Sequence, residues 1–101
     1  MTKTIKFTVA AQNDIEAIYD YTLETWGAVQ ADRYLTMLEN HINQIPAGLA
    51  ATRKFNTWRD GGILTAVGKH KIFVVENEKD FLVVRVLHES RDFLRHLPNA
   101  F

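Results

Sequence analysis

The stretch ILTAVGKHKIFVVENEKDFLVVRVL, residues 63–87, sets the fold class of this 101-residue chain. It contains three apolar runs, at residues 63–67, 70–76 and 81–87, and the links between them are only two and four residues long. Links this short join antiparallel neighbours, so the stretch predicts a three-stranded meander. The third run is almost wholly apolar, which favours a central strand that is covered on both faces.

Two helices are predicted ahead of this meander. Residues 13–26 place apolar side chains at helical spacing, with Asn13 as the N-cap and Gly27 as the stop. Residues 28–45 repeat the helical pattern, and Pro46 ends it. Because little more than Gly27 separates the two helices, we expect them to fold back on each other as an antiparallel hairpin.

The remaining segments complete the predicted fold. Residues 4–9 alternate polar and apolar side chains and predict a first strand. Residues 47–60 lack a period, and we expect a short helical turn at residues 49–52 followed by a loop; residues 90–97 predict a short C-terminal helix. The result is a two-layer α+β domain, β-α-α-β-β-β(-α), with the helical hairpin packed on a four-stranded, mainly antiparallel sheet.

Composition bounds the class of protein. With 47% hydrophobic and 24% charged residues, we expect one soluble domain over residues 1–101, in which only residues 98–101 could be flexible. The chain has no cysteine, and its four histidines lack close spacing with carboxylates, so we expect neither a metal nor a cofactor. No apolar run reaches the ~18–20 residues of a membrane span, and the N-terminus does not resemble a signal peptide. We therefore expect a cytoplasmic protein.

Charge is divided unevenly along the chain although its net value is zero. Residues 1–50 carry three Lys or Arg against six acids, and residues 51–101 carry nine against six. A division of this kind can steer partners of opposite charge. It is too small to predict a nucleic-acid-binding domain, for which a clearly basic composition is typical.

Three segments carry a family resemblance. Residues 21–35, YTLETWGAVQADRYL, fit the pattern Y-x-x-x-x-W-G-x-x-Q-A-x-x-Y. Residues 59–61 and 67–73 fit R-x-G followed by G-x-H-x-I-F, and residues 85–92 fit R-V-L-H-x-x-x-D. Together these segments span roughly residues 5–97 and resemble ParE-like toxins of the RelE/ParE superfamily of type II toxin–antitoxin modules.

The resemblance implies a function and a set of partners. It implies a toxin that inhibits DNA gyrase without catalysing a reaction, and a ParD-like antitoxin that neutralises it in a toxin–antitoxin hetero-oligomer. Antitoxins of this superfamily typically fold on binding and lay an amphipathic helix over the hairpin. Tyr21, Trp26 and Tyr34 are the expected antitoxin contacts, although Trp26 also fits a core position between the helices. Neither a membrane nor sequence-specific nucleic acid is an expected partner.

Exposed aromatic and basic residues in the second half are candidates for target binding. Trp58 beside Arg59 is typical of an interface hot spot, or of an aromatic anchor for the loop. Arg91 and Arg95 share a face if the tail is helical, which favours a charged docking site. The predicted target-binding residues are Trp58, Arg59, His88, Arg91 and Arg95.

Other polar residues are expected to brace the structure. A guanidinium on the last strand needs a partner if it is buried, and Asp92, Glu89 or Asp60 could pair with Arg85. We expect the ring of His70 to bond a neighbouring backbone carbonyl and fix a turn. His88 could cap the last strand or pair with Asp92. The predicted braces are Arg85, Asp92 and His70.

Two alternative functions remain open. A RelE-like, ribosome-dependent ribonuclease would use His88 as the base and Arg85 with Arg91 as the cationic clamp. The modest positive charge of the second half argues against it, since such an enzyme must approach rRNA and mRNA together. A degenerate toxin that only binds its antitoxin is the other alternative, because Ile63, Val74 and Arg91 depart from the family pattern.

Overall fold

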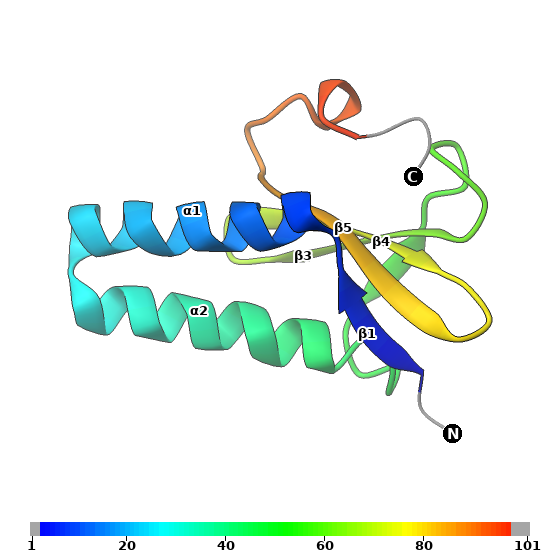
Figure 1. The fold of residues 1–101 in the computed structure, drawn as a ribbon, viewed down its shortest axis with the longest axis horizontal. Coiled ribbons are helices and arrows are strands. Elements are labelled where there is room, and N and C mark those ends of the chain that lie inside the picture. Colours follow the sequence, from blue (N-terminus) through cyan, green and yellow to red (C-terminus); the bar gives the residue numbers. More distant parts are fainter. Residues whose placement is uncertain (1–2, 98–101) are drawn as a thin grey trace.

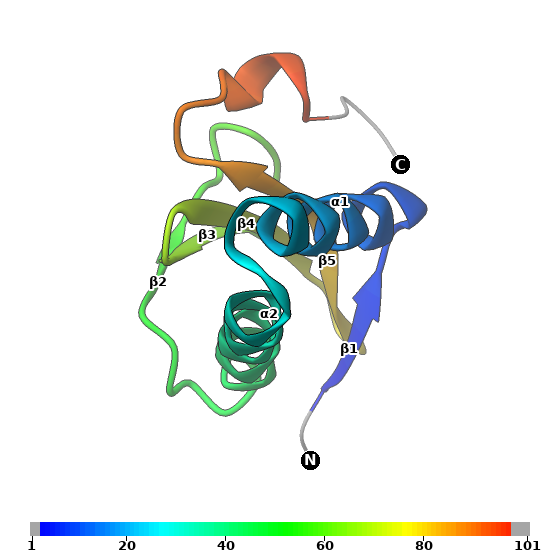
Figure 2. The same cartoon turned by 90° about the vertical axis from the view of Figure 1, so that its left-hand side faces the viewer.

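A computed structural model describes residues 3–97 of the chain (Figure 1). Strand β1 (Thr4–Phe7) leads into helices α1 (Val9–Trp26) and α2 (Ala28–Asn43). Strands β2 (Thr52–Lys54), β3 (Gly62–Val67), β4 (His70–Glu76) and β5 (Asp80–His88) follow, and then a 3₁₀ turn, η1 (Phe93–Arg95). The predicted α+β architecture is confirmed: the α1–α2 hairpin packs against one sheet (Figures 1 and 2). Residues 98–101, which the sequence analysis expects to be flexible, lie outside the described residues.

The sheet has five strands in the order β1-β5-β4-β3-β2. β1 runs parallel to β5, and the other pairs are antiparallel, so the predicted meander of β3, β4 and β5 is confirmed. The expected four strands and the helical turn at residues 49–52 were wrong, because Thr52–Lys54 pairs with β3 as a further edge strand. All three β2 residues are exposed, so their sequence shows no alternation of apolar and polar side chains.

Helix α1 begins four residues earlier than the sequence predicts. Its N-cap is Thr8, whose hydroxyl oxygen accepts the Ala11 N–H at 3.0 Å, and the first helical residue is Val9. The expected N-cap, Asn13, lies inside the helix, and the first strand ends at Phe7. Periodicity identifies a helix by the apolar stripe on its buried face. The first turn of α1 has few buried side chains, so this signal is weak there.

The sheet has an apolar cluster on each face. On the helix side, residues from α1 and α2 pack against Ile72 and Val74 of β4. On the opposite face, called here the back face, Phe73 packs with residues of the 55–58 loop and of the C-terminal tail. Successive strand side chains point to opposite faces, so one strand supplies both clusters. Among the described residues, no helix combines the length and apolar character of a membrane span.

The end of β5 is closed by side chains from α1. β1 stops opposite Val83, so β5 has no neighbouring strand on that edge beyond this point. The Thr8 hydroxyl donates to the Val84 carbonyl at 2.7 Å, and the Val86 N–H donates to Asp14 Oδ2 at 3.0 Å. These two side chains of the α1 region therefore satisfy backbone groups that a longer β1 would otherwise pair.

Arg85 completes this closure. Its Nε and Nη2 donate to the two carboxylate oxygens of Asp14 at 2.7 and 2.8 Å, and its Nη1 donates to the His96 carbonyl at 3.1 Å. The hydrogen bonds that the guanidinium donates to Asp14 raise the pKa of Arg85. Arg85 thus joins α1, β5 and the tail. The partners expected from the sequence, Asp92, Glu89 and Asp60, were wrong, because the carboxylate comes from α1.

A β-bulge interrupts the regular alternation of side chains in this part of β5. Phe73 pairs with Arg85 and Val74 pairs with Val83, so Val84 is the extra residue. Val83 lies in the helix-side cluster, whereas Leu87, which regular alternation would put on the same face, lies in the back-face cluster. The change of face follows from the inserted residue.

Tyr34 fastens α2 to the turn between β3 and β4. Its hydroxyl oxygen accepts the Lys69 N–H at 3.0 Å and lies 2.6 Å from Nδ1 of His70. Gly68 in this turn has φ +57°, and a Cβ there would lie 2.6 Å from the Tyr34 hydroxyl. Glycine is therefore required both by the backbone conformation and by the approach of the tyrosine.

The Asp14–Arg85 pair can be tested by removing its carboxylate. We expect Asp14→Ala to lower the free energy of unfolding by about 2–3 kcal/mol, because it leaves a partly buried guanidinium and the Val86 N–H without their acceptor. The matched control is Asp92→Ala, which removes an exposed carboxylate and should change stability by less than about 0.5 kcal/mol. Urea denaturation measures both; equal losses would contradict the assignment of Asp14 as the partner.

The half-buried position of His70 predicts a pH dependence of stability. Burial, with His88 nearby, lowers the pKa of His70 below its usual value, while Glu89 and Asp14 oppose this shift. The unfolded chain therefore binds the proton more readily, so stability is present above about pH 6.5 and is lost as pH falls through the folded-state pKa. We expect the melting temperature to fall from pH 7.5 to 5.5, and to fall less in His70→Gln. An unchanged pH profile in that variant would contradict the prediction.

Candidate functional site

The loop before β3 and the C-terminal tail meet on the back face of the sheet. The ring centroids of Trp58 and Phe73 are 6.1 Å apart, and those of Phe73 and Phe93 are 5.2 Å apart. Phe55 lies between the two segments, 5.8 Å from Phe93 and 6.1 Å from Trp58. Trp58 is half-buried in this cluster, which is the loop-anchoring position that the sequence left open beside partner contact. The cluster fixes both segments to one sheet face.

The basic residues carried by these segments differ in exposure. Arg59 is half-buried, whereas Arg91 and Arg95 are exposed. Asp92 pairs with Arg95 at 3.5 Å on the surface, so it does not brace β5 as expected. The tail contains a 3₁₀ turn at Phe93–Arg95 in place of the expected longer helix. Arg91 and Arg95 therefore do not share a helical face, although both remain available to a partner.

His88 is exposed and holds a local turn. Its Nδ1 accepts the Ser90 N–H at 3.1 Å and lies 2.7 Å from the Ser90 hydroxyl. The His88 ring also stands edge-on to His70, with centroids 5.4 Å apart. His70 in turn bonds the hydroxyl of Tyr34, so the expected backbone carbonyl partner was wrong. Both histidines are thus tied to turns by neighbouring side chains.

The end of the helical hairpin projects beyond the sheet, at the left of Figure 1. Large apolar side chains are exposed there: 71% of Trp26, 67% of Val29 and 61% of Tyr21. The core position considered for Trp26 was wrong, because the helices extend past the sheet and nothing in residues 3–97 covers their end. Tyr34 is half-buried in its bond with the β3–β4 turn and offers a partner less surface.

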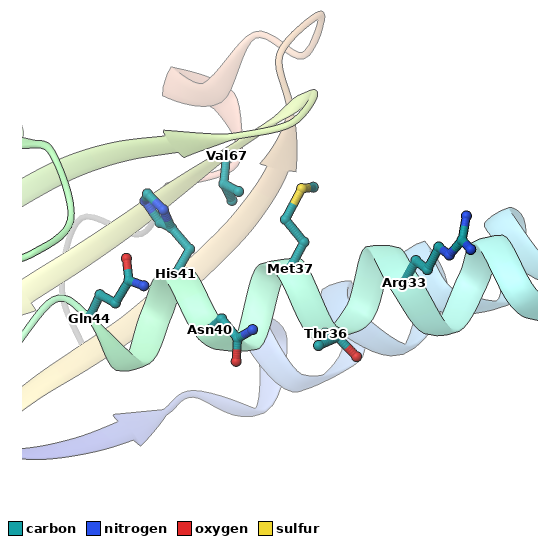
Figure 3. A pocket seen from close by; sticks show the side chains of 7 residues that line it. All are labelled: Arg33, Thr36, Met37, Asn40, His41, Gln44 and Val67. Atoms are coloured by element: carbon teal, nitrogen blue, oxygen red, sulfur yellow. The ribbon is translucent and has the colours of Figure 1, made fainter.

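A shallow hollow of about 430 Å³ runs along α2 beside the end of β3 (Figure 3). Its centre is fixed by His41, whose Nε2 lies 2.7 Å from the Thr65 hydroxyl, which itself donates to the Ala51 carbonyl at 2.6 Å. Burial lowers the pKa of His41. The lining residues are Arg33, Thr36, Met37, Asn40, His41, Gln44 and Val67.

A second hollow, of about 250 Å³, lies over β2, β3 and β4. Arg53 and Lys71 contribute the charged groups of its lining. Sequence analysis did not single out either residue, and the available signal was the excess of cations in the second half of the chain. Its other lining residues are Ala51, Thr52, Leu64, Thr65 and Ala66. Within residues 3–97, no three His, Asp or Glu side chains gather as a metal site would require.

The chain matches one protein family over most of its length. The family described as "ParE toxin of type II toxin-antitoxin system, parDE" matches residues 5–93. The chain is 37% identical over 89 residues to Toxin ParE1 of Mycobacterium tuberculosis, covering 87% of this chain and 91% of that protein. It is 30% identical over 93 residues to Toxin ParE of Escherichia coli, covering 91% and 90%.

Solved structures share the fold at lower identity. The chromosomal ParDE system of P. aeruginosa contains a chain with a TM-score of 0.70 at 16% identity, covering 86% of this chain and 96% of that one. The RelBE2 toxin–antitoxin complex of Mycobacterium tuberculosis contains one with a TM-score of 0.61 at 15% identity, covering 87% and 99%. With the family match across residues 5–93, these similarities mean that the chain belongs to the ParE toxin family of type II toxin–antitoxin systems.

Proposed function

We propose that this chain is a toxin that inhibits DNA gyrase, and thereby blocks replication, and that a cognate ParD-like antitoxin neutralises it in the cytoplasm. The observation that carries the proposal is the similarity to proteins named Toxin ParE1 and Toxin ParE along about nine-tenths of the chain. The resemblance to ParE-like toxins implies gyrase as the target. The fold neighbours are toxin–antitoxin systems, which supports an antitoxin as partner.

The contacts of Arg85 favour binding over nuclease chemistry. Metal-free RNA cleavage needs a base, an acid and a cation that is free to stabilise the developing phosphorane charge. The guanidinium of Arg85 is occupied by both oxygens of Asp14 and by the His96 carbonyl. The nearby base candidate, His88, is engaged with Ser90 through Nδ1. Of the two arginines that would form the clamp of a RelE-like reaction, Arg85 is therefore already committed to the fold.

The exposed tail residues form the proposed gyrase-binding surface. Arg91 and Arg95 are exposed on the tail, which the aromatic cluster fixes to the back face, and His88 is exposed at the end of β5. A rigid aromatic base beside arginines is the composition in which interface hot spots concentrate. Trp58 and Arg59 complete the proposed surface from the neighbouring loop, where each is half-buried.

The projecting end of the hairpin forms the proposed antitoxin surface. Tyr21 and Trp26 are exposed there, and soluble proteins rarely leave such aromatic area without a partner. An amphipathic antitoxin helix would cover this area on binding. Tyr34 contributes to the proposed antitoxin surface indirectly, because its hydrogen bond to Lys69 holds the β3–β4 turn beside α2.

Gyrase inhibition can be measured directly with the purified chain. We expect excess protein to lower DNA supercoiling and to raise the level of gyrase–DNA cleavage complexes. The variant Arg91→Glu/Arg95→Glu should need at least about tenfold more protein for the same effect, while its thermal stability stays within about 0.5 kcal/mol because both side chains are exposed. No effect on gyrase, together with codon-linked mRNA cleavage on ribosomes, would favour the RelE-like alternative. A chain that is harmless in cells would favour the degenerate toxin.

The antitoxin surface can be tested with two equally exposed side chains of α1. Trp26 and Val9 are both 71% exposed, but they lie at opposite ends of the helix. We expect Trp26→Ala to weaken binding of the antitoxin encoded by the adjacent reading frame by about 30-fold, the range of an aromatic hot spot. Val9→Ala should leave the affinity within about twofold. Isothermal titration calorimetry measures both, and equal effects would place the contact elsewhere.

A further inference from the structure

The fold converts the division of charge along the sequence into a division between surfaces. The acids of the first half lie on the hairpin, and α1 carries four acids and no Lys or Arg. Six of the nine cations of the second half lie on β2, on β4 with its preceding turn, and on the tail. These cations are Arg53, Lys54, Lys69, Lys71, Arg91 and Arg95.

Two of these cations line one hollow on the back face. Arg53 pairs with Leu64 across β2 and β3, and Lys71 pairs with Ala66 across β3 and β4. Leu64 belongs to the back-face cluster, and directly paired residues share a face, as do alternate residues of one strand. Arg53 and Lys71 therefore point to the same side of the sheet, consistent with their common place in the lining of the 250 Å³ hollow.

The two cations are not neutralised within residues 3–97. Lys3, Lys6, Arg85 and Arg95 form ion pairs elsewhere in this part of the chain, whereas Arg53 and Lys71 have no carboxylate partner within it. The ammonium group of Lys71 lies 5.4 Å from the centroid of the Phe93 ring, which holds the side chain in place over the cluster. The held ammonium group of Lys71 and the exposed guanidinium of Arg53 therefore share one face, and together they can bind an anion that carries two nearby charges.

We propose that this hollow binds backbone phosphates of duplex DNA, so that the toxin contacts the DNA held by gyrase as well as the enzyme. The proposal rests on the proposed gyrase function. A planar guanidinium and an ammonium group are the side chains that bind phosphate oxygens. The hollow is shallow and borders the exposed edge strand β2, which suits a backbone that passes over the surface. Phosphate contacts carry no information on the bases, so the contact is independent of DNA sequence.

The low net charge of the chain is compatible with this contact. Two phosphate contacts give weak affinity on their own, and a chain of zero net charge has no long-range attraction to DNA. Once the toxin is bound to gyrase, however, the DNA is present at a high effective concentration, and weak contacts then add to the overall affinity. At physiological salt the contact would thus act within the gyrase–DNA complex and leave free DNA largely unbound, whereas at low salt binding to free DNA becomes measurable.

The test compares two variants that lose the same charge. Arg53→Gln/Lys71→Gln removes the cations of the hollow, and Lys6→Gln/Lys79→Gln removes two cations near β1, at the opposite edge of the sheet. Fluorescence anisotropy with a labelled 30-base-pair duplex at low salt gives the affinity and its dependence on salt. We expect the hollow variant to bind at least about tenfold more weakly and to lose about 1.8 from the salt slope, or 0.9 for each phosphate. The control variant should match the wild type.

Several results would overturn the proposal. Equal losses of DNA affinity in both variants would show an effect of net charge alone. Tighter binding to an RNA duplex of the same sequence would identify RNA as the ligand. Arg53→Gln alone, on an exposed edge strand, guards against a loss of fold in the double variant, which circular dichroism also checks. In the gyrase assay, the hollow variant should give fewer cleavage complexes at equal gyrase binding. Full activity of this variant refutes the DNA contact alone, whereas an inactive wild type refutes the proposed function.

Discussion

The carboxylate of Asp14 holds three separate parts of this molecule together. It accepts two hydrogen bonds from Arg85 and one from the backbone of Val86, and Arg85 in turn binds the His96 carbonyl of the tail. A bidentate, charge-assisted pair of this kind fixes direction as well as distance. Because both side chains are largely buried, either charge without the other would carry a desolvation cost. The position of α1, the open edge of β5 and the course of the tail therefore depend on one another.

This closure determines which surfaces remain for partners. It anchors the start of α1, while Tyr34 anchors the middle of α2 to the β3–β4 turn. The far end of the hairpin projects past the sheet (Figure 1), and its apolar side chains near Trp26 are exposed. On the back face, the aromatic cluster around Phe73 fixes the loop and the tail that carry the exposed arginines. Rigid attachment of both surfaces lowers the entropy that a partner must remove on binding.

The parts of the fold that could be predicted are those with a repeating local signal. The helical hairpin and the meander follow from periodicity and short links, and both are present. The edge strand β2 could not be predicted, because its three residues are all polar and exposed and show no alternation of apolar and polar side chains. The partner of Arg85 was missed because Asp14 lies 71 positions away, and the bulge at Val84 breaks the regular alternation of β5. The same bulge hides which face Leu87 occupies, since a one-residue insertion exchanges the two faces of a strand. Arg53 and Lys71 could be recognised as cations, but only strand register brings them to one hollow.

The separation of charge links the two proposed partners. If the back face lies against DNA, the acidic hairpin is repelled by the same phosphates and is directed away from them. The exposed end of the hairpin would then stay outside the gyrase–DNA complex, where an antitoxin could still reach it. Release of the toxin by its antitoxin would need such access, because a surface buried against the target could be reached only after dissociation. A chain of zero net charge can in this way be oriented between two partners. The orientation depends on how positive and negative charges are separated over its surface, and not on the net charge.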